Sequence, residues 1–231
     1  MMGPEMTSPA LAESRTGSTL LICFAVKEEA EFFQSWARSR ADVQILITGM
    51  GRKNAEEACL NALTGAKPRW VLTCGFAGGL DPGLRCGDVL YETDDAGELR
   101  AALTGSGARA GKLNCVDSVA VTAASKAELR RQTGADGVEM ESGVVRAIAR
   151  KQGVPSATLR VILDTAEEDL PLDFNSLMTP DMRMDPVKLG LSLARSPGKI
   201  PVLIRFRKQT QMAARALAKV LERVLDQKEP R

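Results

Sequence analysis

Short apolar runs alternate along the chain with segments whose apolar residues recur every three or four positions. Apolar runs of this length are typical of buried strands, and the longer spacing is typical of amphipathic helices. The runs predict strands at 19–26, 43–48, 69–74, 87–90, 113–121 and 157–163, and a short strand that begins at 137 and ends in the acidic cluster 139–141. Helices are predicted at 28–36, 53–63, 125–133 and 142–151, with a final helix that ends near residue 227. This alternation indicates an α/β fold.

The stretch 137–164 carries the densest set of candidate functional residues. Glu139 and Glu141 flank Met140, so an extended backbone would place both carboxylates on one side and the methionine on the other. Asp164 ends the next apolar run. Because ligands bind at the carboxyl ends of strands in open α/β sheets, we expect these three acids to converge on one pocket.

The same acids also have a purely structural explanation. Acids before a helix interact favourably with its dipole, as Glu139 and Glu141 would do. Asp164 could cap whatever segment follows it. The pattern alone leaves both interpretations open.

A second set of candidates follows the first two predicted strands. Glu29 falls in the first turn of the helix after the first strand, where an ordinary surface acid is also common. Gly49, Met50 and Gly51 form a tight turn before a helix, and such turns present backbone N–H groups to an anion or a ribose. Arg52, beside this turn, would contact an anion or only solvent. The third glycine of a dinucleotide motif is absent, so no dinucleotide site is predicted.

Three glycines in the segment 75–79, expected as a loop after the third strand, would let the backbone approach a ligand closely. Phe76 within it would contact a base or ribose, or fill the core.

Composition narrows the chemistry. The 231 residues suffice for one α/β domain, and a net charge of +2 argues against a general nucleic-acid binder. The absence of histidine excludes Ser-His-Asp and Cys-His nucleophiles and His-based metal sites, so no metal is expected. The cysteines form no Cys-x-x-Cys pair, which fits reduced thiols in a cytoplasmic protein.

The chain is expected to comprise a disordered leader at 1–17 and one domain at 18–231. The leader lacks the basic and apolar regions of a signal peptide. No apolar stretch approaches the roughly 20 residues that span a bilayer.

Three ordered blocks resemble the superfamily of purine nucleoside phosphorylases and 5′-methylthioadenosine/S-adenosylhomocysteine nucleosidases. They are VEMESGVVRAIARKQGVPSATLRVILD at 138–164, TGMGRKNA at 48–55 and CGFAGGLDPGLRCGDVL at 74–90. Glu29, in VKEEAEF, also falls where the nucleosidases carry an active-site glutamate. The resemblance implies a single-domain mixed central sheet flanked by helices and an enzyme that cleaves N-glycosidic bonds.

The resemblance also implies roles for the candidates. Asp164 would protonate the purine, Glu141 with Met140 and Glu139 would bind the ribose, and Glu29 near Arg52 would act on the nucleophile. The nucleophile-facing or base-facing wall would comprise Gly49, Gly51, Arg52, Gly75, Phe76, Ala77 and Gly78. Because the segment 88–139 is shorter than is usual in the family, no residue is assigned to base specificity.

The C-terminal part resembles one subgroup, the hopanoid-associated phosphorylases. Leu170 and Pro171 follow the acid, and SLARSPGKIP at 192–201 matches a later subgroup motif. This resemblance implies an adenosine-type substrate linked to a lipid, with inorganic phosphate as co-substrate and no other cofactor. It also implies a cytoplasmic homo-oligomer with peripheral membrane contact and without nucleic acid.

The nucleophile is left open between phosphate and water. Phosphate needs several cationic or N–H donors, and Glu29 would repel it. Hexameric phosphorylases carry arginine near the position of Glu29 and serine near that of Phe76, so the local residues favour a water-using nucleosidase. A non-catalytic nucleoside-binding protein is a further alternative, which would not need Asp164.

The basic residues of 200–224 lie among apolar ones. We interpret this segment as a helix packed on the sheet with a solvated basic face, and contact with a membrane is the alternative.

Overall fold

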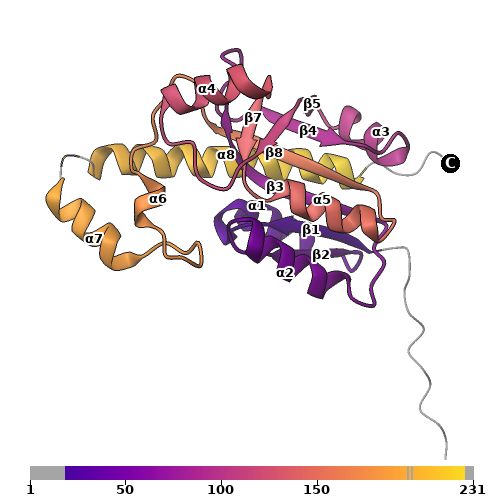
Figure 1. The fold of residues 1–231 in the computed structure, drawn as a ribbon. Helices are drawn as coiled ribbons and strands as arrows, with labels where there is room; N and C mark the ends of the chain where they lie inside the picture. Colours follow the sequence, from indigo (N-terminus) through magenta and orange to yellow (C-terminus); the bar gives the residue numbers. More distant parts are fainter. Residues whose placement is uncertain (1–18, 197, 199, 227–231) are drawn as a thin grey trace, which may run out of the picture.

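The computed structural model describes residues 19–196, 198 and 200–226. The expected leader at 1–17 lies outside these residues. A central sheet has the strand order β2-β1-β3-β8-β4-β5, and β7 joins β3 and β6 beside this path (Figure 1). The strands are β1 (Leu20–Phe24), β2 (Val43–Ile47), β3 (Trp70–Gly79), β4 (Val89–Thr93), β5 (Arg109–Ala110), β6 (Leu113–Cys115), β7 (Gly137–Glu139) and β8 (Ser156–Asp164).

The sheet is mixed, as expected. Strands β2, β1, β3 and β8 run parallel to one another. Strand β4 is antiparallel to β8, and β7 is antiparallel to β3. The parallel strands therefore end at one common edge, which is where open α/β sheets bind their ligands.

Helices cover both faces of the sheet. They are α1 (Lys27–Ala37), α2 (Arg52–Leu63), α3 (Glu98–Gly105), α4 (Ala123–Thr133), α5 (Ser142–Lys151), α6 (Phe174–Leu177), α7 (Pro186–Arg195) and α8 (Ile200–Asp226). Along β1, Ile22 and Phe24 pack with α1, α3 and α8, whereas Leu21 and Cys23 pack with α2 and α5. Successive strand residues point to opposite faces, so a strand covered on both sides is continuously apolar.

Two predictions about strand length were wrong. The glycine segment 75–79 is not a loop but the end of β3, because β8 and β7 supply its backbone hydrogen-bond partners. The strand predicted at 113–121 ends at Cys115, after which the chain turns along the pocket described below. Helices α3, α6 and α7 were not predicted.

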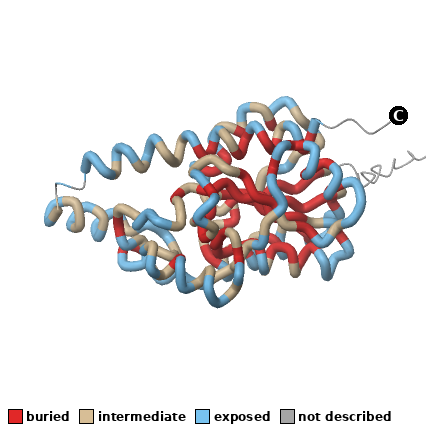
Figure 2. The backbone as a smooth tube through the Cα atoms, turned by 90° about the horizontal axis from the view of Figure 1, so that it is seen from above, coloured by how far each residue is buried: buried red, intermediate tan, exposed pale blue. Residues whose placement is uncertain are grey.

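A helical arm extends from the body. We define it as α7 together with residues 200–212 of α8. The remainder of α8 packs on the sheet through residues such as Leu217 and Leu221, whereas no residue of α7 is buried. In Figure 2 the arm is pale blue and tan, in contrast to the red interior of the body. None of the helices described is both long and apolar enough to cross a membrane.

Candidate active site

A cavity of about 880 Å³ opens at the carboxyl edge of the parallel strands. Its wall includes Glu29 after β1, Gly49 after β2, Phe76 in β3 and Asp164 at the end of β8. Glu141, at the start of α5, completes the group of candidate acids. The parallel arrangement of the strands thus brings together side chains that are up to 135 residues apart in the sequence.

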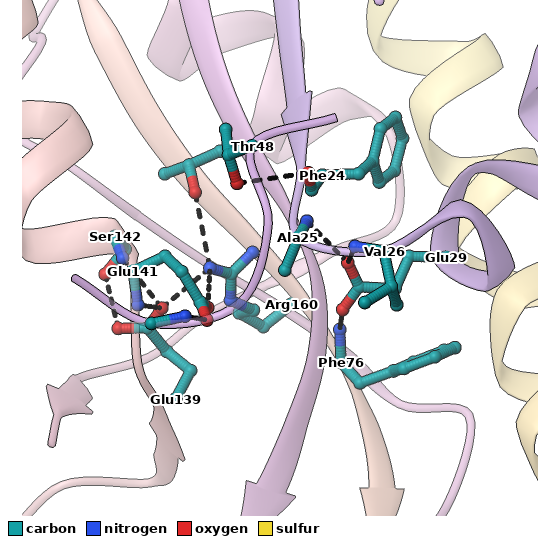
Figure 3. A network of polar contacts seen from close by, with 12 residues as sticks. Phe24, Ala25, Val26, Glu29, Thr48, Phe76, Glu139, Glu141, Ser142 and Arg160 are labelled. Carbon is teal, nitrogen blue, oxygen red and sulfur yellow. Dashed lines mark hydrogen bonds and ion pairs between the residues drawn. The ribbon is translucent and has the colours of Figure 1, made fainter. Parts of the chain in front are cut away.

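Arg160 organises the acids that precede α5. The guanidinium is buried in β8, with its Nη2 2.6 Å from Glu139 Oε2 and 3.7 Å from Glu141 Oε2 (Figure 3). Burial alone would lower the pKa of Arg160, but these carboxylates raise it above its ordinary value. Arg160 therefore stays charged and fixes both glutamates.

Glu139 has its hydrogen-bonding capacity largely used within the protein. The Glu141 and Ser142 backbone N–H groups and the Ser142 hydroxyl all donate to its carboxylate, at 2.6–3.0 Å. Burial acts to raise the pKa of Glu139, but Arg160 and Ser142 outweigh it and hold the pKa below its ordinary value. Glu139 lines the cavity, yet its contacts make it chiefly a support for the start of α5 and for Arg160.

Glu141 is held less completely. The Gly51 N–H donates to its Oε1 at 2.8 Å, which links the glycine turn after β2 to α5. Burial raises the pKa of Glu141, and Arg160 offsets part of that effect. Its Oε2 is 3.7 Å from Arg160 Nη2, and both Glu141 and Met140 line the cavity.

Glu29 is a buried carboxylate that faces the cavity. Its Oε2 accepts N–H groups of Ala25 and Val26 at 2.8 and 3.1 Å, and its Oε1 accepts the Phe76 N–H at 2.8 Å (Figure 3). Burial raises the pKa of Glu29 to about 7, against the opposing effect of Arg160. A carboxyl with such a pKa can exchange a proton near neutral pH, as a general base requires.

Gly75 makes room for this carboxylate. A Cβ atom at position 75 would lie 2.4 Å from Glu29 Oε1, which is closer than non-bonded atoms approach. Gly75 does not line the cavity. Its contribution is that, without a side chain, it lets the Glu29 carboxylate pack directly against the backbone of β3.

Asp164 forms an ion pair with Lys126, a residue of α4 that the sequence did not indicate. The Lys126 side chain is fully buried, and its Nζ also donates to the Thr165 and Glu168 carbonyls at 2.7 and 2.6 Å. Burial raises the pKa of Asp164, and the ammonium of Lys126 works against this rise. Asp164 is thus placed between two effects that decide whether it carries a proton.

Arg52 lies elsewhere. Its Nε is 3.3 Å from Asp117 Oδ1 at an exposed position, beside a smaller cavity of about 90 Å³. Gly51 contributes through its N–H to Glu141 and does not line the large cavity. The other predicted wall residues, Gly49, Phe76, Ala77 and Gly78, do line it.

Much of the cavity wall comes from segments to which no role was assigned. The segment after β6 contributes Val116, Ser118, Val119 and Ala120. An apolar part of the wall, which we call the apolar annex, consists of Phe174, Met178, Met182, Met184 and Phe206. The methionines at 178, 182 and 184 were the available sequence signal, but their spacings of four and then two residues follow neither a helical nor a strand period throughout. Among the described residues, no cluster of His, Cys, Asp and Glu is suited to a metal ion.

The fold is an α/β fold of the nucleoside phosphorylase type, and comparisons with known proteins agree. Residues 92–195 match the sequence model of the Phosphorylase superfamily. A 5′-methylthioadenosine/S-adenosylhomocysteine nucleosidase of Marinomonas sp. (strain MWYL1) is 25% identical over 172 residues, which cover 59% of this chain and 74% of that protein.

Solved structures share the fold at lower identity. The nucleosidase of the same type from Helicobacter pylori superposes with a TM-score of 0.66 at 18% identity, covering 94% of this chain and 100% of that one. Futalosine hydrolase of Helicobacter pylori strain 26695 gives a TM-score of 0.63 at 16% identity, covering 90% and 97%. A Colwellia psychrerythraea nucleosidase solved with adenine gives 0.65 at 17%, covering 90% and 94%. These likenesses confirm the mixed sheet flanked by helices.

Proposed function

We propose that this protein is an enzyme that cleaves the N-glycosidic bond of a purine nucleoside. The observation that carries the proposal is the convergence of Glu29, Glu141 and Asp164 on one cavity. The matched proteins are named as a 5′-methylthioadenosine/S-adenosylhomocysteine nucleosidase and a futalosine hydrolase, which supports the same class of reaction.

Each acid suits one part of this reaction. Cleavage passes through a ribosyl cation-like state, so it is favoured by a protonated leaving group and by a nucleophile on the opposite side of the sugar, as in glycoside hydrolysis. Asp164 would donate a proton to the purine. Glu141 would accept hydrogen bonds from the ribose hydroxyls, and Glu29 would take a proton from the nucleophile.

Water is the nucleophile that this site supports best. The backbone N–H groups of Ala25, Val26 and Phe76 could have held an anion, but they donate to Glu29. The Gly51 N–H is likewise engaged by Glu141. Among the described residues that line the cavity, Arg183 is the one cation. A phosphate ion would therefore meet carboxylates where it needs donors.

Phosphate is the second candidate, as expected from the hopanoid-associated phosphorylase motif at 192–201. Its structural support is Arg160, whose Nε and Nη1 have no hydrogen-bond partner among the described residues. The guanidinium is not part of the cavity wall, which weakens that support.

The apolar annex supports a substrate that carries an apolar group on its ribose. A methylthio group or a lipid chain would both bury apolar area there. An adenosyl-linked lipid, the substrate that the subgroup resemblance implies, fits within this class. We further propose that the protein is a cytoplasmic homo-oligomer. Light scattering would measure the mass of the oligomer.

An activity assay with purified protein tests the proposal. The substrates are 5′-methylthioadenosine, adenosine and an adenosyl-linked lipid, each assayed with and without phosphate. We expect free base and a free sugar product without phosphate, identified by mass. Formation of a sugar 1-phosphate that saturates with phosphate would establish the phosphorylase instead. No cleavage of any of them would favour a nucleoside-binding protein.

Two variants of α1 make this test specific. Glu29→Gln should reduce cleavage by at least ~10²-fold if Glu29 is the general base. Glu31→Gln, an exposed glutamate on the same helix, is the matched control and should retain activity.

A further inference from the structure

The helical arm exposes apolar side chains on both of its helices. Val187 is 68% exposed and Leu191, one turn later in α7, is 51% exposed. On α8, Ile200 and Ile204, also one turn apart, are 46% and 55% exposed, and Val202 lies between them at 46%. A single exposed leucine is ordinary, but a set gathered on one projecting element indicates a contact surface.

The arm is also basic. The sequence contains no Asp or Glu between Asp185 and Glu222. Within that interval the exposed cations on the arm are Lys188, Arg195, Arg205, Arg207 and Lys208. Because the whole chain carries a net charge of only +2, this positive charge is a local feature of the arm.

We propose that the helical arm docks on an anionic lipid surface. Apolar side chains beside lysines and arginines are the combination that holds helices in the interface of anionic bilayers. Each cation near such a surface adds attraction, and the apolar residues enter the boundary of the acyl chains. The described helices include none that could cross the bilayer, so this contact is peripheral.

A second copy of the chain fits this surface less well. A two-fold contact centred on the arm would place the arm of one protomer on the same arm of the other. The cations of the two arms would then face each other with no acid between residues 186 and 221 to pair with them. The body remains available for self-association.

The docked arm would lie beside the cavity. Phe206, in the arm, and Met184, just before α7, both belong to the apolar annex. An apolar substituent could pass from the lipid surface into the annex along this wall. That consequence rests on the proposed function, whereas the docking does not.

Vesicle sedimentation with the full chain tests the docking. We expect binding to vesicles of phosphatidylcholine with phosphatidylglycerol, weak binding to phosphatidylcholine alone, and a partial weakening of binding as salt is raised. The pair Arg207→Gln and Lys208→Gln should weaken binding to the anionic vesicles by roughly 10- to 30-fold. The pair Val187→Ser and Leu191→Ser should weaken it at low and high salt alike.

The matched control is the pair Lys67→Gln and Lys151→Gln. Both lysines are exposed, and they lie in or beside the loops that precede β3 and β8, at the opposite edge of the sheet from the cavity. This control should bind like the unmodified protein. Circular dichroism confirms the fold of each variant.

Three results would overturn the proposal. The first is that the protein binds neither kind of vesicle, and the second is that the arm variants bind as well as the control variant. The third is that the arm substitutions convert an oligomer to a monomer, which would assign the arm to contact with a second copy of the chain. Failure to cleave a nucleoside would leave the vesicle result unchanged, so the two proposals fail separately.

Discussion

The ammonium of Lys126 lies against the carboxylate of Asp164, and both side chains are withdrawn from solvent. The two residues lie in different elements, α4 and the end of β8. Lys126 is the principal charge partner of Asp164, so the protonation state of the proposed acid depends on a lysine outside the cavity wall.

Lys126→Met should destabilise the protein in a pH-dependent way. Removing one partner of a buried ion pair typically costs about 3–5 kcal/mol. Asp164, whose pKa is already raised by burial, would then have a still higher pKa in the folded state than in the unfolded chain. The folded state would hold the proton more tightly, so stability falls as pH rises through the folded-state pKa. Urea unfolding at pH 5 and pH 8 should show the larger loss at pH 8; an equal loss at both would show that Asp164 does not respond to Lys126.

Asp164→Asn should reduce release of the base by at least ~10²-fold while the fold is retained, because the amide cannot donate the proton. Initial rates of base release, followed by chromatography, measure the effect. Glu167→Gln, an exposed acid three residues further on, is the control and should be nearly normal. Near-normal turnover by Asp164→Asn would remove this residue from the mechanism.

Glu29 should give the reaction a pH dependence near neutrality. Its pKa is raised to about 7 by burial, and a general base acts only when deprotonated. The rate should therefore rise with pH through about 7 and level off above it. Rates at saturating substrate from pH 5 to pH 9 measure this rising limb of the pH–rate profile. The limb should be absent from the profile of the residual activity of Glu29→Gln. An unchanged limb in that variant would assign it to another group.

Glu141→Gln should weaken ligands that contain ribose far more than it weakens free adenine. The glutamine can still accept the Gly51 N–H, so the turn is preserved while the charge that binds the hydroxyls is lost. Calorimetric titration with a non-cleavable nucleoside and with adenine compares the two losses. Glu57→Gln on α2 is an exposed control. Equal weakening of both ligands would make Glu141 a structural residue.

The sequence by itself determined the order of most elements and the edge at which the candidate acids meet. The prediction for 142–151 coincides with α5, because apolar spacing and the following Gly153 mark a helix and its end. Glu29 and Asp164 share a cavity because each follows a parallel strand, and parallel strands end at one edge.

Tertiary structure alone decided the surroundings of those acids. Lys126 is one lysine in a polar helix, and only the packing of α4 against residues 164–168 buries it beside Asp164. The segment 75–79 reads as a loop from its glycines, yet pairing with β8 makes it strand. The arm contains both polar and apolar residues, and only the fold shows that its apolar side chains are exposed. Local spacing determines helices and strands, whereas burial and charge pairing depend on contacts between residues far apart in the chain, which no local pattern encodes.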